Sequence, residues 1–85
     1  MYSRDAVVQL TGGLHSKPAG DFVQLAGKYK SDISLEIENR RVNAKSLLGV
    51  LSLGIAKGTE VTLIAAGEDA KEAVEALAQR LDRDI

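Results

Sequence analysis

Apolar side chains recur at two different spacings along this chain, and each spacing predicts one type of element. Near the N-terminal end, Ala6, Val8 and Leu10 occupy every second position, which predicts a first β-strand. Residues 33–37 alternate strictly between aliphatic and polar side chains, which indicates a strand with one buried and one solvated face. Both segments therefore belong to a sheet that has a core on one side only.

Residues that favour turns delimit these strands and predict two more. Gly12 and Gly13 follow the first strand and end it. Asn39 suits a turn into a short strand that ends at Val42. A further strand is expected over residues 61–65, after Gly58.

Three other segments carry apolar residues at helical spacing. We expect the first helix from about Ser16 to Gly27. The second begins at Ser46, a good N-terminal cap, and stops at Gly54. The apolar stripe of the first helix comprises Ala19, Phe22, Leu25, Ala26 and Tyr29, and that of a third helix comprises Ala70, Ala73, Val74, Leu77 and Leu81.

The ends of the third helix carry polar signals. Asp69 and Glu72 have the spacing of a capping box, in which the side chain of each residue accepts a hydrogen bond from the backbone N–H of the other. Arg80 and Arg83 lie near its other end, where cations interact favourably with the helix dipole. The predicted order is therefore β-α-β-β-α-β-α, an α+β domain over residues 1–85 whose helices cover one face of one sheet.

Composition excludes several functional classes. Eleven basic and twelve acidic residues give a net charge of −1, which argues against nucleic acid or an anionic membrane as the main partner. With no cysteine and a single histidine, we expect no metal site. We see neither the roughly 20 consecutive apolar residues of a membrane span nor a signal peptide, and expect a cytoplasmic protein without membrane insertion.

The single histidine lies in the most informative segment, GLHSKPA at positions 13–19. Gly13 permits a tight turn, Ser16 is a suitable helix N-cap, and Pro18 is tolerated in a first helical turn. His15 would thus lie beside free backbone N–H groups and the positive end of a helix dipole, where phosphate binds readily. A nucleophilic imidazole at such a place indicates phosphoryl transfer through histidine.

Positions 13–19 resemble the active-site loop of HPr, the histidine-containing phosphocarrier family of the bacterial sugar phosphotransferase system. A second segment, residues 42–54, resembles the regulatory-serine segment of that family. The resemblance implies an open-faced sandwich, in which three helices cover one face of a four-stranded antiparallel sheet. One departure concerns Lys17, where the family has arginine, because lysine provides a point charge instead of a planar fork.

The resemblance implies a function for the His15 segment. A phosphoryl group would pass from enzyme I to His15 and then to sugar-specific enzyme IIA domains, so the protein is a carrier whose turnover needs partner enzymes. Backbone N–H groups of Ser16 and Lys17 would hold the phosphoryl oxygens, with the Lys17 ammonium adding charge. No cofactor is expected.

Ser46 and the helix after it form a second candidate site. The resemblance implies that an HPr kinase/phosphorylase phosphorylates Ser46, and a phosphate at a helix N-terminus is electrostatically favourable. The apolar residues of this helix cover most of its circumference, which means either complete burial or an exposed docking patch. We expect a patch formed by Leu47, Leu48 and Leu51.

Two alternatives remain at this point. The first is the HPr-like catabolite-repression branch that the chain also resembles. Members of that branch keep the serine site, lack the active histidine and bind a transcription regulator. Residues 31–33 and 59–65 look close to that branch, whereas His15 favours the carrier. The second is a small ligand-binding or RNA-binding α/β domain, which the scarcity of aromatic residues disfavours.

Overall fold

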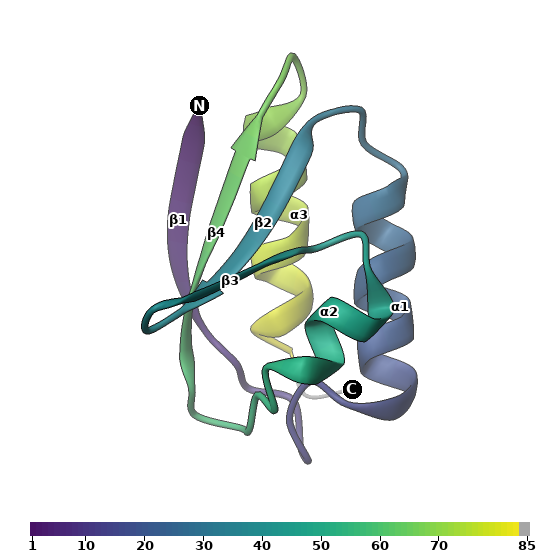
Figure 1. The fold of residues 1–85 in the computed structure, drawn as a ribbon, viewed down its shortest axis with the longest axis vertical. Helices are drawn as coiled ribbons and strands as arrows, with labels where there is room; N and C mark the ends of the chain where they lie inside the picture. Colours follow the sequence, from purple (N-terminus) through teal and green to yellow (C-terminus); the bar gives the residue numbers. More distant parts are fainter. Residues whose placement is uncertain (84–85) are drawn as a thin grey trace.

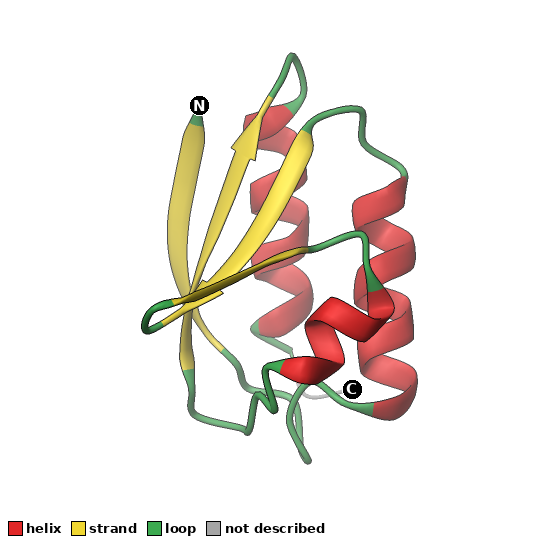
Figure 2. Ribbon diagram, in the orientation of Figure 1, coloured by secondary structure: helices red, strands yellow, loops and turns green. Residues whose placement is uncertain are grey.

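The computed structural model describes residues 1–83 and shows the predicted order of elements (Figure 1). The four strands and three helices follow the chain as β1 (Tyr2–Val7), α1 (Ser16–Gly27), β2 (Asp32–Ile37), β3 (Arg40–Asn43), α2 (Leu47–Ser52), β4 (Glu60–Ala66) and α3 (Ala70–Leu81). The sheet has the order β1-β4-β2-β3, with every neighbouring pair antiparallel. The helices cover one face of it, which confirms the open-faced sandwich (Figure 2).

The register of the central strands explains why one face of the sheet is buried. Leu35 of β2 lies opposite Leu63 of β4, and both side chains are fully buried. Their neighbours Glu36 and Thr62 also lie opposite each other and are partly exposed on the other face. Because side chains alternate along a strand, this pairing directs the aliphatic positions toward the helices.

The helical stripes meet this buried face as predicted. In α3 the five predicted positions are all buried, and Leu77 and Leu81 are completely inaccessible. In α1, Ala19, Phe22 and Ala26 are buried and the predicted Leu25 packs partly against the core, as does Tyr29, which follows the end of the helix at Gly27. The helices are therefore held on the sheet by a single shared core.

The first strand differs from its prediction, because β1 ends at Val7 and the buried Val8 and Leu10 follow it. After Val7 the chain passes the turn before β4 and then reaches the C-terminal end of α3. The N–H of Val8 donates to Thr59 at 2.9 Å, and that of Gln9 donates to the carbonyl of Leu81 at 2.8 Å. Alternating burial without sheet pairing thus mimicked the pattern of a strand.

The capping box predicted at α3 is wrong. Asp69 occupies the N-cap position, but its side chain makes no cap hydrogen bond. Its carboxylate instead accepts hydrogen bonds from the backbone N–H groups of Lys30 and Ser31, at 2.8 and 3.0 Å, and from the Ser31 hydroxyl at 2.5 Å. Asp69 therefore joins the start of α3 to the segment that enters β2.

Candidate functional site

The loop before α1 is fixed by a close approach between two segments of the chain. Gly13 has φ +80°, and a β-carbon placed on it would lie 2.2 Å from the carbonyl oxygen of Ile55. The next residue, Leu14, is fully buried, and its N–H donates to the same oxygen at 2.9 Å. The residue at position 15 is thus positioned by a turn that only glycine permits and by a buried anchor.

His15 lies at the N-terminal end of α1, as predicted, and it occupies the N-cap position itself. Its backbone is extended, its carbonyl accepts the N–H of Ala19 at 3.4 Å, and its side chain makes no capping hydrogen bond. The imidazole is partly exposed. A nucleophilic ring at this position lies at the positive end of the α1 dipole and is accessible to a partner protein.

The prediction that Ser16 caps α1 is wrong, because Ser16 is the first residue of the helix. It has φ +52°, in the left-handed region that residues other than glycine seldom adopt. The first N–H groups of a helix have no partners within it, so those of Ser16 and Lys17 lie next to His15 without intrahelical bonds. Pro18 has no N–H, which leaves these two as the backbone donors nearest to the imidazole along the chain.

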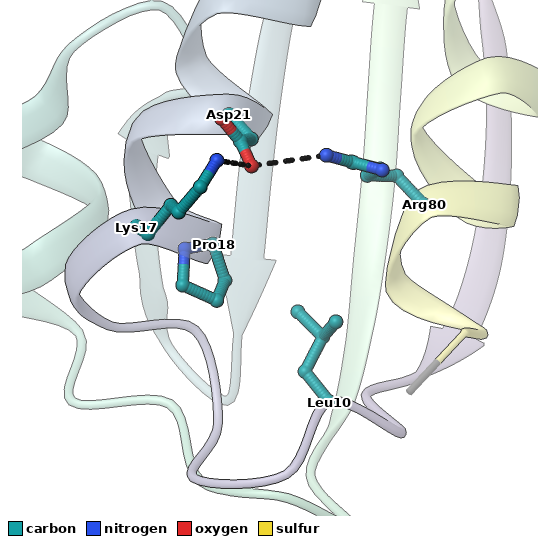
Figure 3. Close-up of a pocket in the computed structure, with 5 residues that line it drawn as sticks. All are labelled: Leu10, Lys17, Pro18, Asp21 and Arg80. Carbon is teal, nitrogen blue, oxygen red and sulfur yellow. Dashed lines mark hydrogen bonds and ion pairs between the residues drawn. The ribbon is translucent and has the colours of Figure 1, made fainter. Parts of the chain in front are cut away.

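Lys17 takes part in an ion-pair cluster, hereafter the Lys17–Asp21–Arg80 cluster (Figure 3). The Asp21 Oδ2 atom accepts Lys17 Nζ at 3.3 Å and the Arg80 guanidinium at 3.0 Å. Leu10 and Pro18 join these residues around a pocket of about 330 Å³. The sequence predicts only a helix-dipole role for Arg80 and does not single out Asp21, although the four-residue spacing from Lys17 to Asp21 is typical of a helical ion pair.

Ser46 is the N-cap of α2, as predicted. Its Oγ atom accepts the N–H of Gly49 at 3.1 Å, and its carbonyl accepts that of Val50 at 3.0 Å. The helix ends at Ser52, two residues before the predicted Gly54, which has φ +59°. The Ser46 side chain is partly exposed.

The apolar residues of α2 divide into a buried group and an exposed group. Val50 and Leu53 are buried, whereas Leu47, Leu48 and Leu51 are 43, 82 and 37% exposed. The structure therefore rules out complete burial of this helix. The exposed leucines lie on α2, and His15 lies at the start of α1. These two helices pack against each other, so the two candidate sites are on neighbouring elements (Figure 1).

Among residues 1–83 there is no cluster of potential metal ligands. Within the same range, no helix has the length and apolar character required to span a bilayer. The α1 end of the molecule carries the His15 imidazole and the side chain of Lys17.

Comparisons with known proteins give the family. Residues 2–83 match the family model for the "PTS HPr component phosphorylation site". The "HPr-like protein Crh" of Bacillus subtilis is 46% identical over 85 residues, which is the whole length of both chains. The structure of HPr from Thermoanaerobacter tengcongensis superposes with a TM-score of 0.93 and 41% identity, covering 96% of this chain and 92% of that one.

A second solved structure represents the catabolite-repression branch. It is the Bacillus subtilis catabolite repression containing protein Crh, a swapped dimer, with a TM-score of 0.79, 46% identity and coverage of 100% and 98% of the two chains. Matches of this length and identity, together with the shared sheet and helices, establish the relationship. The chain belongs to the HPr family.

Proposed function

We propose that this protein is a phosphocarrier that accepts a phosphoryl group on His15 from enzyme I and donates it to enzyme IIA domains. The observation that carries the proposal is the place of its single histidine, partly exposed at the N-cap of α1. Membership of the HPr family supports phosphotransferase-system partners in general. The named partners are part of the proposal.

The proposed transfer needs no metal and no cofactor from this chain. The lone pair of neutral His15, at Nδ1, attacks phosphorus, and the bond from phosphorus to the donor breaks with its electrons returning to the donor. The attack requires the neutral form of the ring, in which Nδ1 carries a free lone pair. The N–H groups of Ser16 and Lys17 then stabilise the phosphoryl oxygens, and the Lys17 ammonium adds a mobile charge.

Ser46 supplies the proposed regulation. An HPr kinase/phosphorylase would phosphorylate its hydroxyl, which is partly exposed at the start of α2. The new charge would lie next to the patch of Leu47, Leu48 and Leu51, through which enzyme I would dock. Phosphorylation would therefore weaken that docking and favour a partner with a basic pocket, such as a catabolite-control transcription regulator.

A second candidate function is that of a catabolite-repression co-regulator acting through phosphoserine. It is supported by the 46% identity to Crh over the full chain. His15 separates the candidates, because the carrier requires a reactive imidazole whereas the co-regulator requires only Ser46. If His15 accepts no phosphoryl group, the protein cannot be a carrier, and the co-regulator function is favoured.

The stability of the bound phosphate tests the proposal. The protein is incubated separately with enzyme I plus labelled phosphoenolpyruvate and with the kinase plus ATP. A carrier acquires acid-labile label in the first reaction, as a phosphohistidine does. If enzyme I gives no label and the kinase gives acid-stable label, the result would support the co-regulator instead.

A further inference from the structure

Two cations from different helices share one carboxylate oxygen, and one of them belongs to Lys17, two residues after His15. Lys17 and Asp21 lie one turn apart on α1, and Arg80 reaches Asp21 from the last turn of α3 (Figure 3). Both cations contact the same atom, Oδ2 of Asp21. The two cations therefore share one acceptor atom, and Asp21 retains one of them if the other leaves.

The two ion pairs are unequal. The Lys17 side chain is 84% exposed and its nitrogen lies 3.3 Å from the oxygen, whereas the Arg80 side chain is 37% exposed and lies at 3.0 Å. Exposed lysine pairs within a helix are weak and are screened by salt. If Lys17 leaves, Asp21 thus keeps its stronger ion pair with Arg80, and the carboxylate does not become unpaired.

We propose that Asp21 is a positioning residue, which retains Lys17 in the unphosphorylated protein and releases it to the phosphoryl group on His15. This inference rests on the proposed phosphorylation of His15. A phosphoryl group carries more negative charge than one carboxylate, and Lys17 is two residues from His15 on a flexible four-carbon stem. On phosphorylation the ammonium moves to the phosphoryl oxygens, and Arg80 retains Asp21.

The charge of Asp21 therefore opposes phosphorylation through Lys17. In Asp21→Asn the ammonium has no anionic competitor on α1, so it is available to the incoming phosphoryl group from the start. Asp21→Glu keeps the charge on the same turn and should behave as the wild type. Removing a nearby negative charge would also favour phosphorylation directly, so the test must separate this effect from the effect that depends on Lys17.

A double-mutant cycle makes that separation. Wild type, Asp21→Asn, Lys17→Met and the double variant are treated with phosphoramidate, which transfers its phosphoryl group to an imidazole nitrogen and releases ammonia. The rate of phosphohistidine formation is measured at low salt, with circular dichroism to confirm that each variant is folded. Asp21→Asn should raise the rate about two- to fivefold, the size expected of an exposed pair, and the increase should be smaller in the Lys17→Met background, where only the direct effect of the lost charge remains.

The outcomes distinguish the inference from the function on which it rests. An equal effect of Asp21→Asn in both backgrounds, or no effect in either, overturns the positioning role. Labelling by phosphoramidate but not by enzyme I overturns the carrier function, while the cycle still tests Asp21. An absence of labelling from both donors overturns both.

Discussion

Gly13 and Ile55 approach so closely that no side chain can stand at position 13. A β-carbon there would lie 2.2 Å from the Ile55 carbonyl oxygen and 2.9 Å from the α-carbon of Ala56. Both neighbours are backbone atoms, which cannot move aside as a flexible side chain can. The proposed active-site loop thus depends on the loop between α2 and β4.

Gly13→Ala should therefore destabilise the protein more than Gly12→Ala. Both residues have φ near +80°, so each alanine has a backbone strain of about 1 kcal/mol or more. Only position 13 adds a steric clash, because nothing lies within 4 Å of a β-carbon at Gly12. Urea denaturation of the two variants measures the difference, and equal free energies of unfolding would contradict the steric argument.

Replacing Lys17 should change phosphoryl transfer according to the charge and shape of the new side chain. Lys17→Arg should raise the rate of His15 phosphorylation by enzyme I or lengthen the lifetime of phosphohistidine, because a guanidinium binds phosphoryl oxygens in a bidentate manner. Lys17→Glu should impair both. Lys28→Glu changes the net charge equally at the other end of α1 and serves as the control; if it and Lys17→Glu have the same effect, Lys17 has no local role.

Ser46→Asp should slow phosphorylation of His15 by enzyme I and raise affinity for the catabolite regulator. The added charge would lie beside Leu47 and Leu51, whose apolar surface would otherwise dock against the enzyme. Ser52→Asp places the same charge at the opposite end of α2 and provides the comparison. An unchanged rate together with unchanged affinity for the regulator would leave Ser46 as a helix cap alone.

Acid should destabilise the fold through Asp69. Hydrogen bonds from the Ser31 hydroxyl and from the Lys30 backbone hold the pKa of Asp69 below its ordinary value of 3.8. A carboxyl whose pKa is lowered by folding contributes stability above its unfolded pKa, and that contribution disappears as the pH falls through the folded pKa.

The unfolding free energy of Asp69→Asn should accordingly fall less than that of the wild type between about pH 5 and about pH 2, an interval that contains the ordinary carboxyl pKa. The Tyr2 hydroxyl also lowers the pKa of Glu75, so both proteins lose some stability in acid. The difference between them isolates Asp69. Parallel pH profiles would show that the Asp69 hydrogen bonds do not favour the ionised form.

The features that sequence predicted best are those set by local periodicity. The alternation at residues 33–37 and the stripe of α3 depend on positions close together in the chain, and the structure confirms both. The exposure of leucines on α2 was also predictable, because apolar residues cover most of the circumference of this short helix and cannot all face the core.

The features that sequence missed depend on contacts between distant segments. Asp69 bonds to residues 38 and 39 positions away, although its local pattern indicated a capping box. Arg80 reaches Asp21 across 59 positions. The end of β1 differs from its prediction because Val8 and Leu10 are buried outside the strand, where the backbone bonds to Thr59 and Leu81, and local alternation does not distinguish such burial from a sheet.

The reactivity of His15 decides whether this protein is a phosphocarrier, and labelling by enzyme I measures that reactivity. Wild type and His15→Ala are incubated with enzyme I and labelled phosphoenolpyruvate, and circular dichroism confirms that both are folded. We expect acid-labile phosphate on the wild type and none on the variant, because the chain has no other histidine. Equal labelling of the two proteins, or no acid-labile label on the wild type, would contradict it.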